Sequence, residues 1–191
     1  MKLHIYIFRH GETYWNKHKI FTGWRDPKLT PKGIKQAKLL AIRLKNKKFQ
    51  VAYHTRLTRS KQTLKEVLKF HPECKKLIKD DRIIERSYGR LQGKKHTTII
   101  KKVGKKQYDI WHRSYDIPPP GGESVKMVEK RVIPFVKDLI KVMKKEKVNV
   151  AISAHNNSMR PFRKYFEKLN KKQMMKLENP WDNYFEYTID V

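Results

Sequence analysis

Cysteine is almost absent from this sequence of 191 residues, which contains Cys74 and no other. A disulfide framework and a cysteine-rich zinc site are therefore both excluded. Long apolar runs are missing as well. The N-terminal run is interrupted by Arg9 and His10, too early for a signal peptide, and no later run approaches the roughly 18 residues of a membrane span. We therefore expect a cytoplasmic protein that does not enter a membrane.

Acidic residues are also scarce, since 18 Asp and Glu stand against 46 Lys and Arg and leave a net charge of +28. Most of these cations are lysines spread along the chain, which favours an ordinary solvated surface. Binding of polyanions, or attraction of small phosphorylated metabolites, is the alternative. The basic stretches lack the interleaved aromatic residues of a nucleic-acid stacking platform, which argues against nucleic acid as the partner, although the charge is compatible with it.

Apolar runs of strand length alternate along the chain with segments of helical spacing. Strands are predicted at residues 3–8, 49–53, 77–84, 148–153 and 184–189, the last at a sheet edge. Helices are predicted at 31–44, 57–70, 123–145 and 156–169, with one further basic helix within 93–111. Thr30 and Pro31 suit the N-cap and the first position of the first helix. This alternation predicts a single three-layer α/β domain spanning 1–191, with a mostly parallel sheet and helices on both faces.

Charged side chains follow several of the predicted strands. In an open α/β sheet, ligands bind beyond the carboxyl ends of the strands. The side chains in question are Arg9, His10, Arg56, Arg59, Glu85, Arg86 and His155. Together they suit phosphoryl transfer: a neutral imidazole attacks phosphorus, guanidinium groups hold the phosphoryl oxygens, and a carboxylic acid protonates the leaving oxygen.

Residues 9–13 (Arg-His-Gly-Glu-Thr), with Trp15 and Asn16, resemble the signature of the histidine phosphatase superfamily. Segments 21–24, 85–93, 111–120 and 155–160 resemble its cofactor-dependent phosphoglycerate mutase branch, in the expected order along nearly the whole chain. The most discriminating segment is 111–120, with the pattern Trp-x-Arg-Ser-Tyr-Asp-x-Pro-Pro-Pro. The resemblance implies a phosphoglycerate mutase-like fold and the interconversion of 3- and 2-phosphoglycerate in glycolysis and gluconeogenesis.

The resemblance also implies roles for individual residues. His10 would accept the phosphoryl group as a phosphohistidine, and Glu85 would be the general acid and base. The phosphoryl group would be surrounded by Arg9, Arg59 and His155. Arg59 is preferred to Arg56 because the family spacing Ser/Thr-x-Leu-x-Arg is met by residues 55–59. The family is primed by 2,3-bisphosphoglycerate, and neither the resemblance nor the residue spacing calls for a metal.

The remaining implied contacts would bind the body of a small phosphorylated metabolite. They are Asn16, Thr22, Gly23, Arg86, Tyr88, Arg113 and Asn157. Three departures from the family pattern affect this group. Either Lys95 or His96 takes the place of the usual lysine, His112 stands where arginine is usual, and Asn156 stands where glycine is usual. We expect these changes to weaken the hold on the second anionic group of the substrate.

Two other functions stay open: a phosphate-monoester phosphatase of the same superfamily, and a basic polyanion-binding protein on a degenerate enzyme fold. The sequence stops soon after Ile189 and has only a short segment after the proline run at 118–120. Longer members of the family have a tail that covers the site and an insert that helps them associate. These differences predict appreciable hydrolysis beside the mutase reaction, and a monomer.

Overall fold

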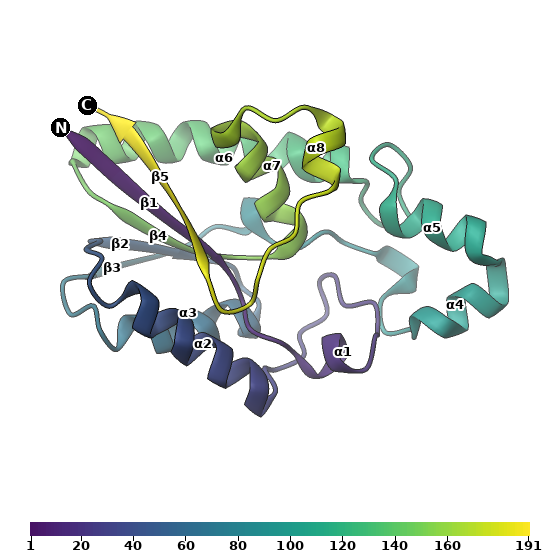
Figure 1. Cartoon of the computed structure of the whole chain (residues 1–191). Helices are drawn as coiled ribbons and strands as arrows, with labels where there is room; N and C mark the ends of the chain where they lie inside the picture. Colours follow the sequence, from purple (N-terminus) through teal and green to yellow (C-terminus); the bar gives the residue numbers. More distant parts are fainter.

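The computed structural model describes all residues, Met1–Val191, and is built around one sheet of five strands in the order β3-β2-β4-β1-β5 (Figure 1). The strands are β1 (Lys2–Arg9), β2 (Val51–His54), β3 (Lys76–Lys79), β4 (Val150–Ala154) and β5 (Tyr184–Asp190). The pairs β1–β4, β4–β2 and β2–β3 are parallel, and β5 runs antiparallel to β1 at the edge. The predicted mostly parallel sheet and its edge strand are confirmed.

Eight α-helices accompany the sheet. They are α1 (Tyr14–Lys17), α2 (Pro31–Leu44), α3 (Thr58–Leu68), α4 (His96–Val103), α5 (Lys105–Arg113), α6 (Val125–Glu146), α7 (Asn156–Glu167) and α8 (Lys171–Met175). Two short 3₁₀ helices lie at Asp81–Ile83 and Gly89–Leu91. The start of α2 is as predicted, because the Thr30 side chain accepts a hydrogen bond from the Gly33 amide and Pro31 is the first helical residue.

The alternating side chains of β1 show how the layers form. Tyr6 and Phe8 pack against residues of α2 and α3 on one face, whereas Ile5 and Ile7 join the larger core with residues of α6 and α7 on the other. Figure 1 shows these two helix layers below and above the sheet, with α4 and α5 extending beyond it. The three-layer α/β architecture is therefore confirmed. No helix combines the length and the apolar composition needed to cross a membrane.

Three local predictions are wrong. The single basic helix expected within 93–111 is two helices, because Gly104 between them adopts a φ of 83°, a conformation that glycine tolerates at little cost. The strand expected at 77–84 ends at Lys79, and a 3₁₀ turn separates it from Glu85. The segment between the predicted strand at 3–8 and the predicted helix at 31–44, where no helix was expected, contains α1, which Thr13 caps by accepting from the Asn16 amide. Short-range polar bonds, not apolar periodicity, determine this last element.

Two glycines bring the start of α2 against the loop that follows β1. A Cβ atom on Gly11 would lie 2.3 Å from the Gly33 carbonyl oxygen, and one on Gly33 would lie 2.0 Å from the Glu12 carbonyl oxygen. Both obstacles are backbone atoms, so neither can rotate away. The close packing holds the loop where Thr30 donates its amide to the Glu12 carbonyl at 2.9 Å. The residues after β1, including His10, therefore take their position partly from α2.

We expect Gly33→Ala to destabilise the fold. Alanine in a helix normally gains about 0.5–1 kcal/mol over glycine, but here the overlap with Glu12 should cost about 1–3 kcal/mol. The steric cost should win, and urea unfolding should show a lower midpoint. Lys35→Ala, at an exposed position of α2, is the matched control and should change the midpoint little. A more stable Gly33→Ala protein would show that the loop can move.

Candidate active site

One pocket at the carboxyl edge of the sheet collects most of the predicted site residues. Twelve of them line it: Arg9, His10, Asn16, Thr22, Gly23, Arg59, Glu85, Tyr88, His96, His112, Asn156 and Asn157. Ile20 and Phe21 complete the lining and were not predicted. Four predicted residues do not line it: His155, Arg86, Lys95 and Arg113. Residues far apart in sequence thus form one site.

His10 is held in a single tautomer at the end of β1. Its Nδ1 lies 2.7 Å from the carbonyl oxygen of Gly11, which can only accept a hydrogen bond, so Nδ1 carries the proton. Its Nε2 accepts from Nε of Arg59 at 3.3 Å, which requires an unprotonated nitrogen. The free electron pair of His10 is therefore on Nε2, directed toward Arg59.

The surroundings of His10 keep the imidazole neutral. Burial, followed by the charges of Arg59 and Arg9, holds the pKa of His10 well below its ordinary value of 6.5. The same burial lowers the pKa of Arg9 and of Arg59 to about 10, so both stay charged at neutral pH. A neutral nucleophile beside two permanent cations is the electrostatic arrangement that an incoming phosphate dianion requires.

Arg59 lies in the first turn of α3 and is tied to the loop on the opposite side of the pocket. Its two terminal nitrogens donate to the carbonyl oxygens of Gly23 at 2.7 Å and Arg25 at 2.8 Å. Arg56, in contrast, is an exposed partner of Asp81 at 2.7 Å and takes no part in the pocket. The geometry therefore agrees with the choice of Arg59 over Arg56.

His155 lies below the pocket at the end of β4, fully buried beside His10, with ring centres 5.1 Å apart. Its Nε2 is paired with the hydroxyl of Thr55 at 2.8 Å, whereas its Nδ1 has no hydrogen-bonding partner in the protein. If the Thr55 hydroxyl donates to Nε2, the proton of His155 is on Nδ1. A phosphoryl oxygen would then provide the acceptor that this buried donor lacks.

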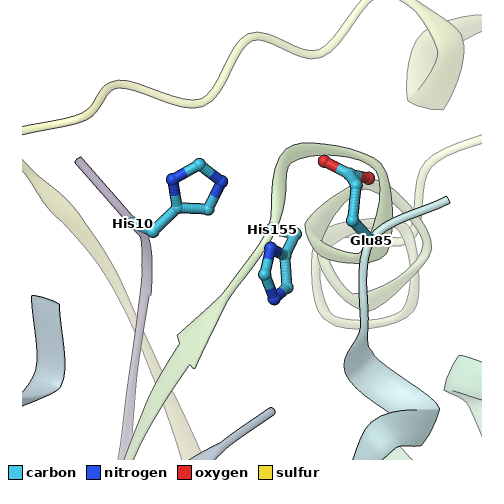
Figure 2. A group of neighbouring side chains, drawn as sticks. All are labelled: His10, Glu85 and His155. Carbon is cyan, nitrogen blue, oxygen red and sulfur yellow. The ribbon is translucent and has the colours of Figure 1, made fainter. Parts of the chain in front are cut away.

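Glu85 faces the two histidines from a third segment of the chain (Figure 2). Its Oε1 accepts from the backbone amides of Arg86 at 2.7 Å and Asn157 at 3.1 Å. These two bonds fix the carboxyl group and leave Oε2 free for a proton. The carboxyl group is therefore positioned to exchange a proton with an oxygen of a bound substrate.

His10, Glu85 and His155 each place one ligand atom within 4.8 Å of the others, a spacing that suits a metal ion. Their hydrogen bonds favour an anion instead. Arg59 donates to Nε2 of His10, and two backbone amides occupy Oε1 of Glu85. The adjacent Arg9 and Arg59 guanidinium groups would repel a cation.

The predicted substrate contact of Arg86 finds no support in the geometry. Its guanidinium group is buried and donates to the carbonyl oxygens of Trp111, His112 and Glu123 at 2.6–2.9 Å. These bonds anchor the end of α5 beside the pocket, and Arg86 itself does not line the pocket. Lys95 and Arg113 are exposed and lie outside the lining. Of the two candidates for the usual lysine position, His96 is the one that lines the pocket.

Asn179 is a buried residue that sequence reasoning missed. Its side-chain nitrogen donates to the backbone and side-chain oxygens of Asn156 at 3.1 and 3.0 Å, and its carbonyl accepts from Arg9 at 3.2 Å. Arg163 donates to its side-chain oxygen at 3.0 Å. The segment after α8 therefore supports both Arg9 and the start of α7. No motif or spacing around position 179 gave a signal for this role.

Phosphoryl transfer through histidine needs a ring nitrogen without a proton and an anion-binding frame around it. The site offers both, which places the protein among the α/β phosphoryl-transfer enzymes that use a histidine nucleophile. The chain belongs to the histidine phosphatase superfamily (branch 1), which it matches over residues 5–188. The family resemblance predicted from the motifs is confirmed.

Two relatives illustrate the similarity within the superfamily. One is a 2,3-bisphosphoglycerate-dependent phosphoglycerate mutase of Parvibaculum lavamentivorans, 42% identical over 178 residues that cover 91% of this chain and 84% of that protein. The other is a phosphoglycerate mutase of Schizosaccharomyces pombe, 43% identical over 179 residues with the same two coverages. The similarity therefore extends over most of both chains.

Solved structures resemble the fold. A structure titled mycobacterial hydrolase superposes with a TM-score of 0.84 at 21% identity and covers 98% of this chain and 92% of that one. A phosphoglycerate mutase from Bacillus anthracis superposes with a TM-score of 0.77 at 20% identity and the same coverages. At these identities the likeness establishes the fold alone.

The buried histidines should make the protein less stable in acid. The pKa of His155 is lowered by burial and then by Arg59. Below about pH 6.5, the histidine is therefore protonated in the unfolded chain and stays neutral in the folded protein. This contribution is fully present above that pH and is lost as the pH falls, by up to about 1.4 kcal/mol per pH unit for each such histidine. Urea unfolding at a series of pH values below about 6.5 should show this decrease as a slope of the unfolding free energy against pH.

His155→Gln should reduce that slope by the share of one histidine, because glutamine does not titrate. His18→Gln, at an exposed position, should leave the slope unchanged. Equal slopes in wild type and His155→Gln would mean that His155 is protonated in the folded protein.

Asn179→Ala should weaken both the fold and the site. The buried partners on Asn156 and Arg163 would lose their bonds, which should cost about 1–3 kcal/mol of unfolding free energy. Since Arg9 and Asn156 would also be less well held, inorganic phosphate should bind more weakly, as measured by calorimetry. Asn183→Ala, an exposed asparagine of the same segment, is the control. Unchanged phosphate affinity in a folded Asn179→Ala protein would limit Asn179 to a stabilising role.

Proposed function

We propose that this chain is a 2,3-bisphosphoglycerate-dependent phosphoglycerate mutase that interconverts 3-phosphoglycerate and 2-phosphoglycerate. The observation that carries the proposal is the free electron pair on Nε2 of His10, held between buried cations at the sheet edge. The relatives at 42–43% identity, both named as phosphoglycerate mutases, support this choice of substrate within the superfamily.

The first step of the proposed reaction phosphorylates His10. Its Nε2 attacks a phosphorus atom of 2,3-bisphosphoglycerate, a nitrogen–phosphorus bond forms, and the bond to the glycerate oxygen breaks. Arg9, Arg59 and the Nδ1 proton of His155 stabilise the negative charge on the transferring phosphoryl oxygens. The primer leaves a phosphoenzyme and one molecule of phosphoglycerate.

Glu85 supplies and removes the proton in each half of the cycle. As the glycerate oxygen leaves, the carboxylic acid of Glu85 protonates it and becomes a carboxylate. In the return step that carboxylate takes the proton from the acceptor hydroxyl as it attacks the phosphohistidine. The two backbone amides on Oε1 keep the carboxyl group in place through both steps.

The rest of the pocket would bind and orient the glycerate. Asn16 approaches from α1 and Thr22 and Gly23 from the loop after it. Tyr88 approaches from the segment after Glu85, and Asn156 and Asn157 from the start of α7. Fixed placement matters because the same phosphohistidine must meet the hydroxyl on either carbon of the glycerate. The proposed pathways, glycolysis and gluconeogenesis, assign the protein to the cytoplasm.

A phosphate-monoester phosphatase is the second candidate. Water attacking the phosphohistidine in place of a glycerate hydroxyl would convert the same site into a hydrolase. The products distinguish the two: 2-phosphoglycerate from 3-phosphoglycerate for the mutase, and inorganic phosphate for the phosphatase. We expect both products, with 2-phosphoglycerate in excess.

Incubation with 2,3-bisphosphoglycerate labelled in its phosphates tests the proposal. The wild-type protein should acquire label that is lost in acid and kept in alkali, as phosphohistidine is. Added 3-phosphoglycerate should remove the label as 2,3-bisphosphoglycerate, which becomes labelled 2-phosphoglycerate once its 3-phosphate has been transferred back to His10. His10→Ala should acquire none, because the variant lacks the unprotonated Nε2 that lies beside Arg59. His18→Ala should behave as wild type. Label that persists in His10→Ala, or its release only as inorganic phosphate, would contradict the mutase assignment.

A further inference from the structure

Trp24 lies between the two parts of the site that the proposed reaction uses, the nucleophile and the general acid. The carbonyl groups of its neighbours Gly23 and Arg25 accept from the terminal nitrogens of Arg59 at 2.7 and 2.8 Å. Its own indole Nε1 donates to the backbone carbonyl of Glu85 at 2.7 Å. Trp24 itself does not line the pocket. A residue outside the pocket therefore contacts the support of both groups.

The bond from Trp24 reaches the carboxyl group of Glu85 through one rigid unit. The Glu85 carbonyl and the Arg86 amide belong to the same peptide group, and in a trans peptide the C=O and N–H bonds point in opposite directions within one plane. That amide donates to Oε1 of the Glu85 side chain at 2.7 Å. A donor that fixes the carbonyl therefore also fixes the direction of the amide, and with it the carboxyl group.

The carbonyl of Glu85 has a second donor, which comes from a different element. Nη2 of Arg131, on α6, donates to it at 3.0 Å. Arg131 is held in turn by the carboxylate of Glu123 at 2.9–3.0 Å. The peptide group after Glu85 is thus tied to α6 by one donor and to the loop before α2 by the other. Trp24, unlike Arg131, belongs to the loop that holds Arg59.

The alternative role for Trp24 is packing, and its surroundings argue against it. The residue is 40% exposed and belongs to none of the three hydrophobic clusters. Its ring is covered by the guanidinium group of Arg56, 5.2 Å from the ring centre, and Arg56 is itself exposed. An exposed ring gains little from apolar burial. The bond from its N–H group to Glu85 is therefore the contact that ties this side chain to the site.

We propose that Trp24 is a positioning residue for the general acid Glu85. Its indole N–H fixes the peptide group that holds the carboxyl group, and the loop that carries it is fixed to Arg59. The carboxyl group is thereby kept at a constant distance from the phosphorus atom that Nε2 of His10 attacks. The inference rests on the proposed function, in which Glu85 protonates the leaving glycerate oxygen. Trp24 itself exchanges no proton with the substrate.

The choice of leaving group separates this role from a general loosening of the site. An alkoxide such as the glycerate oxygen needs a proton as it leaves, so its departure depends on Glu85. p-Nitrophenolate is a stabilised anion that leaves without one. Both kinds of phosphate monoester use the same Nε2 of His10 and the same guanidinium groups. A residue that acts through Glu85 should therefore affect the alkyl ester alone, whereas one that acts through Arg59 should affect both.

Single-turnover phosphorylation of His10 by 2,3-bisphosphoglycerate and by p-nitrophenyl phosphate tests the inference. Glu85→Gln is the reference and should slow the first reaction by about 10²–10⁴-fold and the second little. Trp24→Phe keeps an aromatic ring and removes the N–H donor. It should slow the first reaction by roughly fivefold to tenfold, the effect of one hydrogen bond, and leave the second nearly unchanged. Equal slowing of both reactions, or of neither, would overturn the inference.

The double variant provides a second measure that needs 2,3-bisphosphoglycerate alone. If Trp24 acts through Glu85, adding Trp24→Phe to Glu85→Gln should slow the reaction no further. Additive effects of the two substitutions would overturn the inference. Tyr165→Phe, at another exposed aromatic residue, is the control and should match wild type in both reactions. The urea midpoint of Trp24→Phe should stay close to that of wild type, because Arg131 still bonds the Glu85 carbonyl.

The proposed function and this inference fail in different ways. A selective effect of Glu85→Gln without a selective effect of Trp24→Phe would leave the proposed mechanism intact and reject the positioning role alone. Equal slowing of both reactions by Glu85→Gln would remove Glu85 as the general acid and reject the inference with it. Absence of label transfer from 2,3-bisphosphoglycerate to His10 would reject the mutase assignment as well.

Discussion

The bond from Nε of Arg59 to Nε2 of His10 is the interaction on which the site depends. This bond requires Nε2 of His10 to be unprotonated. The positive charge of Arg59, which donates the bond, lowers the pKa of His10 and so helps to keep the ring neutral. Arg59 in turn is fixed by the carbonyls of Gly23 and Arg25, so the orientation of the imidazole follows from backbone positions on two sides of the pocket. In the proposed mechanism, the same guanidinium group that orients His10 before substrate arrives also holds the phosphate afterwards.

The parallel sheet explains why these groups meet. β1, β4 and β2 lie side by side and point the same way, so the residues after their carboxyl ends emerge at one edge. His10 follows β1, His155 follows β4, and Thr55, the partner of His155, follows β2. Backbone geometry therefore brings together the reactive imidazole, its neighbour and that neighbour's support. Glu85 comes from outside this arrangement and needs its own fixation by the amides of Arg86 and Asn157.

The sequence was most informative where one strand and the few residues after it define the position. The apolar runs before His10 and His155 were sufficient to place both residues at the sheet edge. Arg86 was assigned to substrate because its motif was known, yet its bonds to Trp111, His112 and Glu123 arise from tertiary contacts that no local pattern contains. Asn179 escaped prediction for the same reason, since its partner Asn156 is 23 positions away in the sequence. Gly104 was a local signal for the break between α4 and α5, but the helical spacing of residues on both sides of it suggested one continuous helix.

The lysines that produce most of the net charge of +28 are not the residues that form the pocket. The pocket lining contains no lysine, and its permanent cations are Arg9 and Arg59. Charges on the solvated surface act over a Debye length of about 8–10 Å at physiological salt, so distant lysines raise the rate at which anions arrive but discriminate little between them. Discrimination requires groups that touch the ligand. A cationic surface therefore attracts anions generally and leaves the choice among them to the groups that line the pocket.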